Sequence, residues 1–214
     1  MDPNRIRLAV FASGGGSNFQ AILDAVARGD LNLDLALLLS NKRKAGALAR
    51  AENHGIPTAI LRPADFDQPE AYEDALVEVL RTHGVNFIAL AGYLKMIPAV
   101  VVRAFRGRIL NIHPALLPAF GGKGMYGKRV HEAVLDYGAR WTGVTVHLVD
   151  EHYDTGPVVL QAPVPVEAED TPETLAARVL KTEHRLYPEA LRLFADGRTT
   201  LEGRHVRIHE QSSA

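Results

Sequence analysis

Residues 6–23 read IRLAVFASGGGSNFQAIL, and this stretch decides the fold. Residues 6–12 form an apolar run of the length expected for a buried strand. Phe19, Ile22 and Leu23 follow at helical spacing. The glycine-rich residues 13–18 join the two, so the chain begins with a strand, a tight turn and a helix, as βαβ units do.

The rest of the chain repeats this alternation of strand-like and helix-like segments. Further strands are expected at residues 35–39, 58–61, 86–91, 108–112, 144–149 and 158–164, with helices at 45–54, 72–80, from about 98, at 130–137 and at 172–195. The order predicts an α/β fold, with an open, mostly parallel twisted sheet and helices on both faces. We expect one domain over residues 1–214, with a core of about 6–198 and a short C-terminal tail.

Composition excludes several classes of protein. Apolar residues make up 47% and charged residues 23%, values typical of folded globular domains, and the net charge of −1 argues against a nucleic-acid partner. The chain has no Cys, which removes disulfides and thiolate chemistry. No apolar run approaches a membrane span and no signal peptide is recognisable, so a cytoplasmic protein is expected.

The glycine-rich segment 13–18 is placed to bind an anion, since it opens a helix whose first N–H groups point toward the turn. A dinucleotide site would need a third Gly where Phe19 stands, so a single phosphate monoester fits better. The alternative is a purely structural turn. A second glycine-rich segment, 122–129, has the P-loop spacing but ends in Arg129 where Ser or Thr is required, and is interpreted as a mobile active-site loop.

Three polar residues are candidates for chemistry. Asn111 and His113 lie two positions apart at the end of a strand, so that both side chains point to one side at the sheet edge where ligands bind. Asp154 lies in the acidic turn 150–157; it could be a turn residue only, or it could raise the pKa of His113 and keep it protonated. His147 is either a support for this arrangement or a sheet histidine.

Two further patterns bear on binding. Glu183 shares a helix face with apolar residues and needs a partner, either in a structural ion pair or in substrate hydroxyls. His131-Glu132 is not followed by the second His of a zinc helix, because Leu135 stands there, and His205 and His209 have no third ligand. No metal is therefore expected.

Together these motifs resemble the phosphoribosylglycinamide formyltransferases, the folate-dependent transformylases of purine synthesis. The resemblance covers about residues 6–198 and rests on five segments: Ser13-Gly14-Gly15-Gly16-Ser17-Asn18, Leu90-Ala91-Gly92-Tyr93-Leu94, Asn111-Ile112-His113-Pro114, Asp154-Thr155-Gly156-Pro157, and Glu183-His184 with Tyr187-Pro188.

The resemblance implies formyl transfer from 10-formyltetrahydrofolate, as co-substrate, to the amine of glycinamide ribonucleotide, by direct attack and without a covalent enzyme intermediate. It implies that Asn111, His113 and Asp154 are the catalytic residues. It further implies that Gly16, Ser17, Asn18 and Glu183 hold the phosphate and ribose, and that Leu94, Lys95, Met96, Ile97 and Asn111 contact the folate. The expected partners are small molecules, with no nucleic acid and no membrane, and the expected state is a monomer or homodimer.

Three other functions fit part of the sequence. Methionyl-tRNA formyltransferase shares the Asn-x-His-Pro core but carries a C-terminal tRNA-binding domain, which is not expected here because little follows Ala195. The formyltetrahydrofolate deformylase carries an N-terminal regulatory domain, which is not expected because the core starts at Ile6. A phosphate-binding module without catalysis explains the glycine-rich segment but leaves Asn111, His113 and Asp154 without a task.

Overall fold

The structure is a computed structural model that describes residues 5–210, and its chain divides into two compact units, Met1–Leu110 and Asn111–Ala214. The elements of the first unit are β1 (Arg7–Phe11), α1 (Ser17–Ala27), β2 (Asp34–Ser40), α2 (Gly46–Asn53), β3 (Thr58–Ile60), the 3₁₀ turn η1 (Pro63–Asp65), α3 (Pro69–Thr82), β4 (Phe87–Leu90) and α4 (Ala99–Ala104). The elements that follow are β5 (Ile109–His113), which contains the boundary, α5 (Lys128–Asp136), β6 (Trp141–Leu148), β7 (Val158–Pro165), α6 (Pro172–Ala195), β8 (Thr199–Glu202) and β9 (His205–Ile208).

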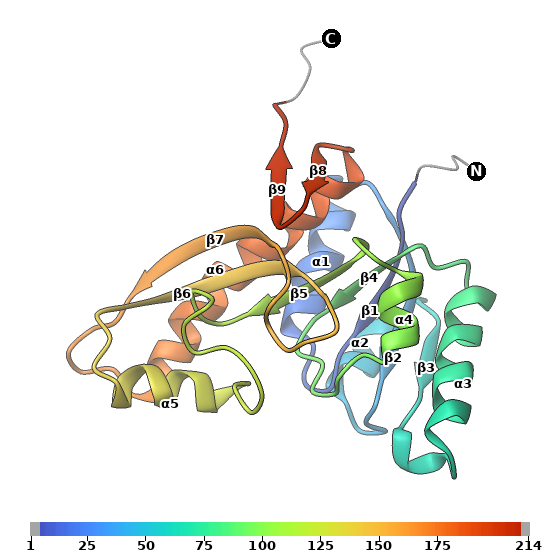
Figure 1. Cartoon of the computed structure of the whole chain (residues 1–214), viewed down its shortest axis with the longest axis horizontal. Coiled ribbons are helices and arrows are strands. Elements are labelled where there is room, and N and C mark those ends of the chain that lie inside the picture. Colours follow the sequence, from blue (N-terminus) through green and yellow to red (C-terminus); the bar gives the residue numbers. More distant parts are fainter. Residues whose placement is uncertain (1–4, 211–214) are drawn as a thin grey trace. The chain divides into compact units, whose positions relative to one another are not determined.

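Seven strands form one sheet in the order β3-β2-β1-β4-β5-β6-β7 (Figure 1). Strand β1 pairs in parallel with both β2 and β4, and β2 pairs in parallel with β3, whereas β6 and β7 are antiparallel. The reversal of strand order beside β1 is the arrangement of doubly wound α/β folds. The predicted fold class, a mostly parallel open sheet with helices, is confirmed.

The core of the first unit is built on β1. Its Leu8, Val10 and Phe11 are fully buried, as strands covered on both faces require. Helix α1 buries Phe19 and Ile22, the residues whose spacing predicts the helix. At the carboxyl ends of β1 and β4 the chain segments are linked, because Ser13 N donates to Gly92 O at 3.1 Å.

In the second unit, α6 covers β6 and β7 (Figure 1). The helix begins at a capping box, in which Thr171 Oγ1 accepts from Thr174 N and Thr174 Oγ1 accepts from Thr171 N, with Pro172 at the first helical position. This start is the predicted one. The helix continues through Pro188 to Ala195. In contrast to these buried segments, Trp141 at the start of β6 is 58% exposed.

A β-hairpin follows α6 where the sequence analysis predicts only a tail. Strands β8 and β9 pair antiparallel, and Gly203 at φ +59° lies in the turn between them. The alternation that signals these strands is short, and its apolar members Leu201 and Ile208 stay largely exposed, so no buried face marks it. The last residues of the predicted tail, 211–214, lie outside the described residues. Over residues 5–210, no helix combines the length and the apolar character needed to cross a membrane.

Candidate active site

The glycine-rich segment of the first unit is shaped by a close approach to α2. Gly16 is the N-cap of α1 at φ +74°, and a Cβ there would lie 2.7 Å from the Cβ of Ala47, so only Gly fits. Two bonds from α2 hold the segment: Ala47 N donates to Gly14 O, and Arg50 Nε donates to Gly15 O. Helix α1 has no side-chain cap and no acidic residue in its first turn. An anion bound there would meet the positive end of the helix dipole.

Ser13 connects this segment to the chain after β4. Its hydroxyl donates to Asn41 Oδ1 at 2.5 Å and accepts from Leu94 N at 2.9 Å, and Ser13 itself is buried. The following segment, 94–97, presents Leu94 and Met96 at 42% and 48% exposure and buries Ile97. Lys95 between them is exposed. Within the first unit, the predicted phosphate and folate segments are therefore joined by one hydroxyl.

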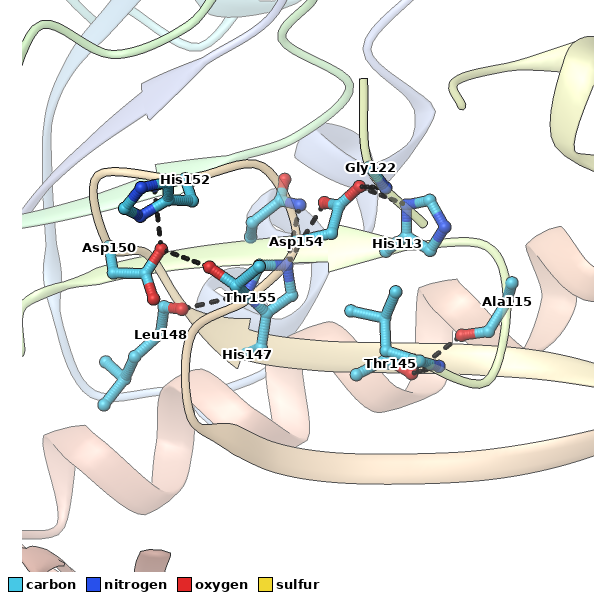
Figure 2. A network of polar contacts seen from close by, with 12 residues as sticks. His113, Ala115, Gly122, Thr145, His147, Leu148, Asp150, His152, Asp154 and Thr155 are labelled. Atoms are coloured by element: carbon cyan, nitrogen blue, oxygen red, sulfur yellow. Dashed lines mark hydrogen bonds and ion pairs between the residues drawn. The ribbon is translucent and has the colours of Figure 1, made fainter. Parts of the chain in front are cut away.

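The second unit brings the three candidate catalytic residues into one polar cluster. Asn111 and His113 come from β5, His147 from β6, and Asp154 from the turn between β6 and β7. Figure 2 shows the Asp154 carboxylate beside His113, with the side chain of His147 below it. Asp154 Oδ2 lies 3.7 Å from His113 Nδ1, and Asp154 Oδ1 lies 3.6 Å from His147 Nε2. These distances show that the acidic turn faces His113, an arrangement that the sequence left open.

His113 is held by a backbone carbonyl on its other ring nitrogen. Nε2–H donates to Phe120 O at 2.9 Å, so Nδ1 is the nitrogen that faces Asp154. Burial lowers the pKa of His113 below its ordinary value, and this outweighs the opposing effects of Asp154 and of the Phe120 carbonyl. The expectation that Asp154 keeps His113 protonated is therefore corrected, because the carboxylate lies beyond hydrogen-bond distance of a side chain that is only 4% exposed.

Asp154 remains ionised despite its surroundings. Burial raises the pKa of its carboxyl, but His147, His113 and the N–H of Gly122 together lower it further, so the net pKa lies below the ordinary value. Gly122 N donates to Asp154 Oδ2 at 2.8 Å. The carboxylate therefore keeps its charge next to an imidazole that favours the neutral form.

His147 orients Asn111. Its Nδ1–H donates to Leu148 O at 2.8 Å, which leaves Nε2 as the acceptor for the amide of Asn111 at 3.0 Å. An amide has two N–H donors, so this bond fixes the side chain of Asn111 and leaves its second N–H for another acceptor. Sequence reasoning weighs His147 only as a support or a sheet histidine, and the structure gives it the supporting place.

The acidic turn that carries Asp154 is held by its own residues. Asp154 is in the left-handed region, at φ +56°. Asp150 Oδ1 accepts from His152 N and from Thr155 Oγ1, at 3.0 and 2.8 Å (Figure 2). A Cβ on Gly156 would lie 1.8 Å from Leu148 O, so the turn packs directly on the end of β6. These contacts set the direction in which the carboxylate points.

Three contributors to the cluster are missed by sequence reasoning. Phe120 and Gly122 act through backbone groups, which residue type does not reveal, although Phe120 has the positive φ of +54°. His131 of α5 is considered above only as part of an absent zinc motif. It is buried, its Nδ1 has no hydrogen-bond partner, and burial together with nearby His113 lowers its pKa. A buried His in a helix otherwise rich in charged residues was the available signal.

Glu183 lies in α6, half-buried on the helix whose Val179, Leu186 and Ala190 are buried. The predicted mixed face is therefore present. No group of three or more metal-binding side chains occurs among the residues that the structure describes.

Comparison with known proteins identifies the family. A model of the formyl transferase family matches residues 6–191. The chloroplastic phosphoribosylglycinamide formyltransferase of Arabidopsis thaliana is 52% identical over 191 residues, which are 89% of this chain and 65% of that protein. The phosphoribosylglycinamide formyltransferase of Bacillus subtilis is 40% identical over 186 residues, covering 87% of this chain and 93% of that protein.

Solved structures agree with these matches. The crystal structure of glycinamide ribonucleotide transformylase 1 from Symbiobacterium toebii superposes with a TM-score of 0.92 at 42% identity, covering 98% of this chain and 96% of that one. The chain spans about 65% of the length of the Arabidopsis relative. With the family model matched over most of its residues, the chain belongs to the formyl transferase family.

Proposed function

We propose that the protein transfers the formyl group of 10-formyltetrahydrofolate to the glycyl amine of glycinamide ribonucleotide, a step of purine synthesis. The observation that carries the proposal is the polar cluster of the second unit, in which His147 contacts Asn111 at hydrogen-bond distance and Asp154 lies at ion-pair distance from both His147 and His113. The two compact units are proposed to act as one formyltransferase domain. The relatives described above bear names with this activity.

The chemistry needs stabilisation of an oxyanion and movement of one proton. Attack of the amine on the formyl carbon forms a tetrahedral oxyanion, for which the second N–H of Asn111 and an N–H of His113 are the proposed donors. The resting imidazole of His113 is neutral because burial lowers its pKa, and its one N–H, on Nε2, is bonded to Phe120 O. The forming negative charge favours uptake of a proton from water at Nδ1, which then donates to the oxyanion and returns the proton to water when the intermediate collapses.

Asp154 is the proposed proton carrier. Its carboxylate is ionised, since its pKa is lowered, and it can accept the proton that the attacking amine loses. The same proton, passed directly or through water, goes to the departing folate nitrogen as the carbon–nitrogen bond breaks. One carbon–nitrogen bond forms, one breaks, and one proton passes from the amine to the folate nitrogen, while His113 ends in its starting neutral state, so no covalent enzyme intermediate is needed.

Binding of the ribonucleotide is assigned to residues of α1 and of α6. The start of α1, with Gly16, Ser17 and Asn18, is proposed to hold the substrate phosphate through backbone N–H groups and the helix dipole. Half-buried Glu183 is proposed to accept hydrogen bonds from the ribose hydroxyls.

The folate is assigned to Leu94, Lys95, Met96 and Ile97, together with Asn111. The exposed apolar side chains of Leu94 and Met96 fit a flat aromatic ring, which would remove their surface from water. Ser13 fixes the backbone of Leu94, so this segment is held in place before any ligand arrives.

The decisive experiment mixes the protein with 10-formyltetrahydrofolate and follows release of tetrahydrofolate with and without glycinamide ribonucleotide. Release that depends on the nucleotide, with formylated nucleotide as product, supports transfer. Equal release in its absence would mean hydrolysis and would contradict the proposal.

We further propose a cytoplasmic enzyme that acts on small molecules, without a nucleic-acid or membrane partner, as a monomer or homodimer. The plant relatives carry chloroplastic names, so fractionation of the source cells tests the location. Light scattering coupled to size exclusion measures the mass in solution, and a trimer or larger species would contradict the proposed state.

A further inference from the structure

The C-terminal hairpin contacts the turn that carries Asp154. Arg204, next to Gly203 in the turn of the hairpin, donates from Nη2 to the carbonyl oxygen of Thr155 at 2.8 Å. Strand β9 also lies against β7, the strand that follows the acidic turn. The hairpin therefore contacts the acidic turn through Arg204 and the strand that follows the turn through β9.

Thr155 is held from two sides. Its hydroxyl donates to Asp150 within the turn, and its carbonyl accepts from Arg204 outside the turn. Asp154, immediately before it, has φ +56°, a conformation that persists in a residue other than Gly only where the surroundings maintain it. A guanidinium bonded to a carbonyl is a charge-assisted hydrogen bond, which is stronger than a neutral one.

The hairpin is itself braced. Its open end is closed by two bonds between Arg198 and His209, in which Arg198 O accepts from His209 N and Arg198 Nε donates to His209 O, both at 2.9 Å. Arg207 also pairs with Glu202 across the strands at 2.5 Å, but both side chains are more than half exposed, so this ion pair adds little to the bracing. The position of Arg204 is thus fixed by a closed two-stranded element rather than by a loose tail.

We propose that Arg204 is a positioning residue for the reaction: through Thr155 it holds the acidic turn so that Asp154 faces His113 and His147. Arg204 contacts neither of these imidazoles and no atom of the substrates is assigned to it. Its effect is transmitted through one peptide carbonyl to the neighbouring carboxylate. The expected change in kcat rests on the proposed function, whereas the expected position of the Asp154 carboxylate does not.

The kinetic test compares Arg204→Ala with Arg207→Ala, a matched variant that removes another exposed Arg from the same hairpin. We expect Arg204→Ala to lower kcat by about 3- to 10-fold, the range of a partly exposed hydrogen bond, with KM for both substrates within twofold. Arg204→Lys, which keeps a cationic donor, should recover part of the loss. Arg207→Ala should leave kcat unchanged.

A second readout does not need activity. NMR titration of the His113 imidazole, assigned by its loss in His113→Ala, reports the distance of Asp154. The titratable groups acting on His113 are Asp154, His147 and His131, and the carbonyl of Phe120 acts on it as well. Displacement of the Asp154 carboxylate would lower the pKa of His113 further. Simple removal of the positive charge of Arg204 would raise it, so the sign separates the two causes.

The outcomes are distinguishable. A folded Arg204→Ala protein with wild-type kcat, or a His113 pKa that rises or stays constant, overturns the positioning role. Equal losses in Arg204→Ala and Arg207→Ala also overturn it, because they would indicate a general effect of the hairpin. A wild-type protein without nucleotide-dependent release would refute the proposed function, while the titration would still decide the role of Arg204.

Discussion

The glycine-rich segment and the polar cluster differ in the chemical groups that form them. The segment before α1 relies on backbone: its shape depends on Gly16 lying against Ala47, and its charge on the end of a helix without a side-chain cap. The polar cluster relies on side chains, with two imidazoles, one amide and one carboxylate held at fixed distances.

The difference predicts how each region responds to change. A backbone site tolerates new side chains except where a Cβ cannot fit, and its failure appears in folding and in binding of the anion. A side-chain cluster fails in its chemistry, because removal of one group leaves the others correctly placed but without a partner. The four predictions below compare these two kinds of failure.

The largest effect is expected in the polar cluster. His113→Ala and Asp154→Ala should each lower kcat by ~10²-fold or more, the scale of losing an acid–base or oxyanion group. The fold should persist, as circular dichroism would verify. His152→Ala is the control, since this exposed side chain lies in the same turn and its ring has no role in the cluster. A folded His113→Ala enzyme with the wild-type rate would remove the cluster from the reaction.

The glycine-rich segment should fail in stability instead. Gly16→Ala forces a Cβ to 2.7 Å from Ala47 at a positive φ, and should cost about 1–3 kcal/mol of the free energy of unfolding. Gly15→Ala is the control, because a Cβ there meets nothing within 4 Å. Urea denaturation measures both.

A double variant refines this comparison. Ala47→Gly removes the Cβ that the new side chain of Gly16→Ala would contact. The double variant should therefore regain part of the stability that Gly16→Ala loses, and the remaining loss is the cost of the positive φ. A Gly16→Ala protein as stable as Gly15→Ala would contradict the close approach of α2.

The polar cluster should also make stability depend on pH. Burial lowers the pKa of His113 and His131 below 6.5, so below that pH the unfolded chain binds more protons than the folded one. The free energy of unfolding should therefore fall as pH is lowered from neutral through 6.5, by at most ~1.4 kcal/mol per pH unit for each imidazole. The lowered pKa of Asp154 extends the loss below pH 4, since its ordinary value is 3.8.

His131→Gln isolates one contribution. Urea denaturation at several pH values between 7.5 and 5.5 gives the slope of the free energy of unfolding against pH. In His131→Gln this slope should be smaller than in the wild type, by up to the contribution of one bound proton. Because slopes are compared, a uniform change in stability does not affect the result. An unchanged slope would mean that His131 does not take part.

The smallest effect is expected at a helix start. Thr171→Ala removes the side-chain cap of α6 and should cost about 1 kcal/mol of the free energy of unfolding, with kcat and KM unchanged. Helix α1, which has no such cap, provides the contrast. A lower kcat with unchanged stability would contradict the proposed difference, in which the start of α1 binds substrate and the start of α6 does not.

Much of the fold was predictable because apolar spacing decided it. The apolar run before the glycine-rich segment forms β1, and α6 begins at Thr171-Pro172, where the hydroxyl and the Pro predict a helix start. The hairpin of β8 and β9 was not predicted, since its strands are short and mostly exposed and so leave no apolar stripe.

The candidate site was predictable only in its side chains. Asn111 and His113 could be selected by type and position at a strand end, and Asp154 by its place in the acidic turn, and their roles stay predictions. The carbonyl of Phe120 and the N–H of Gly122 could not be selected, because every residue carries these groups. The direction of the His113 pKa depends on burial by distant segments, which the local sequence does not contain.

The exposure of Trp141 has a practical consequence for optical work. It is the single tryptophan of the chain, and its indole is already more than half in water in the folded state. Intrinsic fluorescence will therefore shift little on global denaturation and will be a weak monitor of it. The same indole will respond strongly to any molecule that covers the beginning of β6, so it can serve as a built-in reporter of association at that edge.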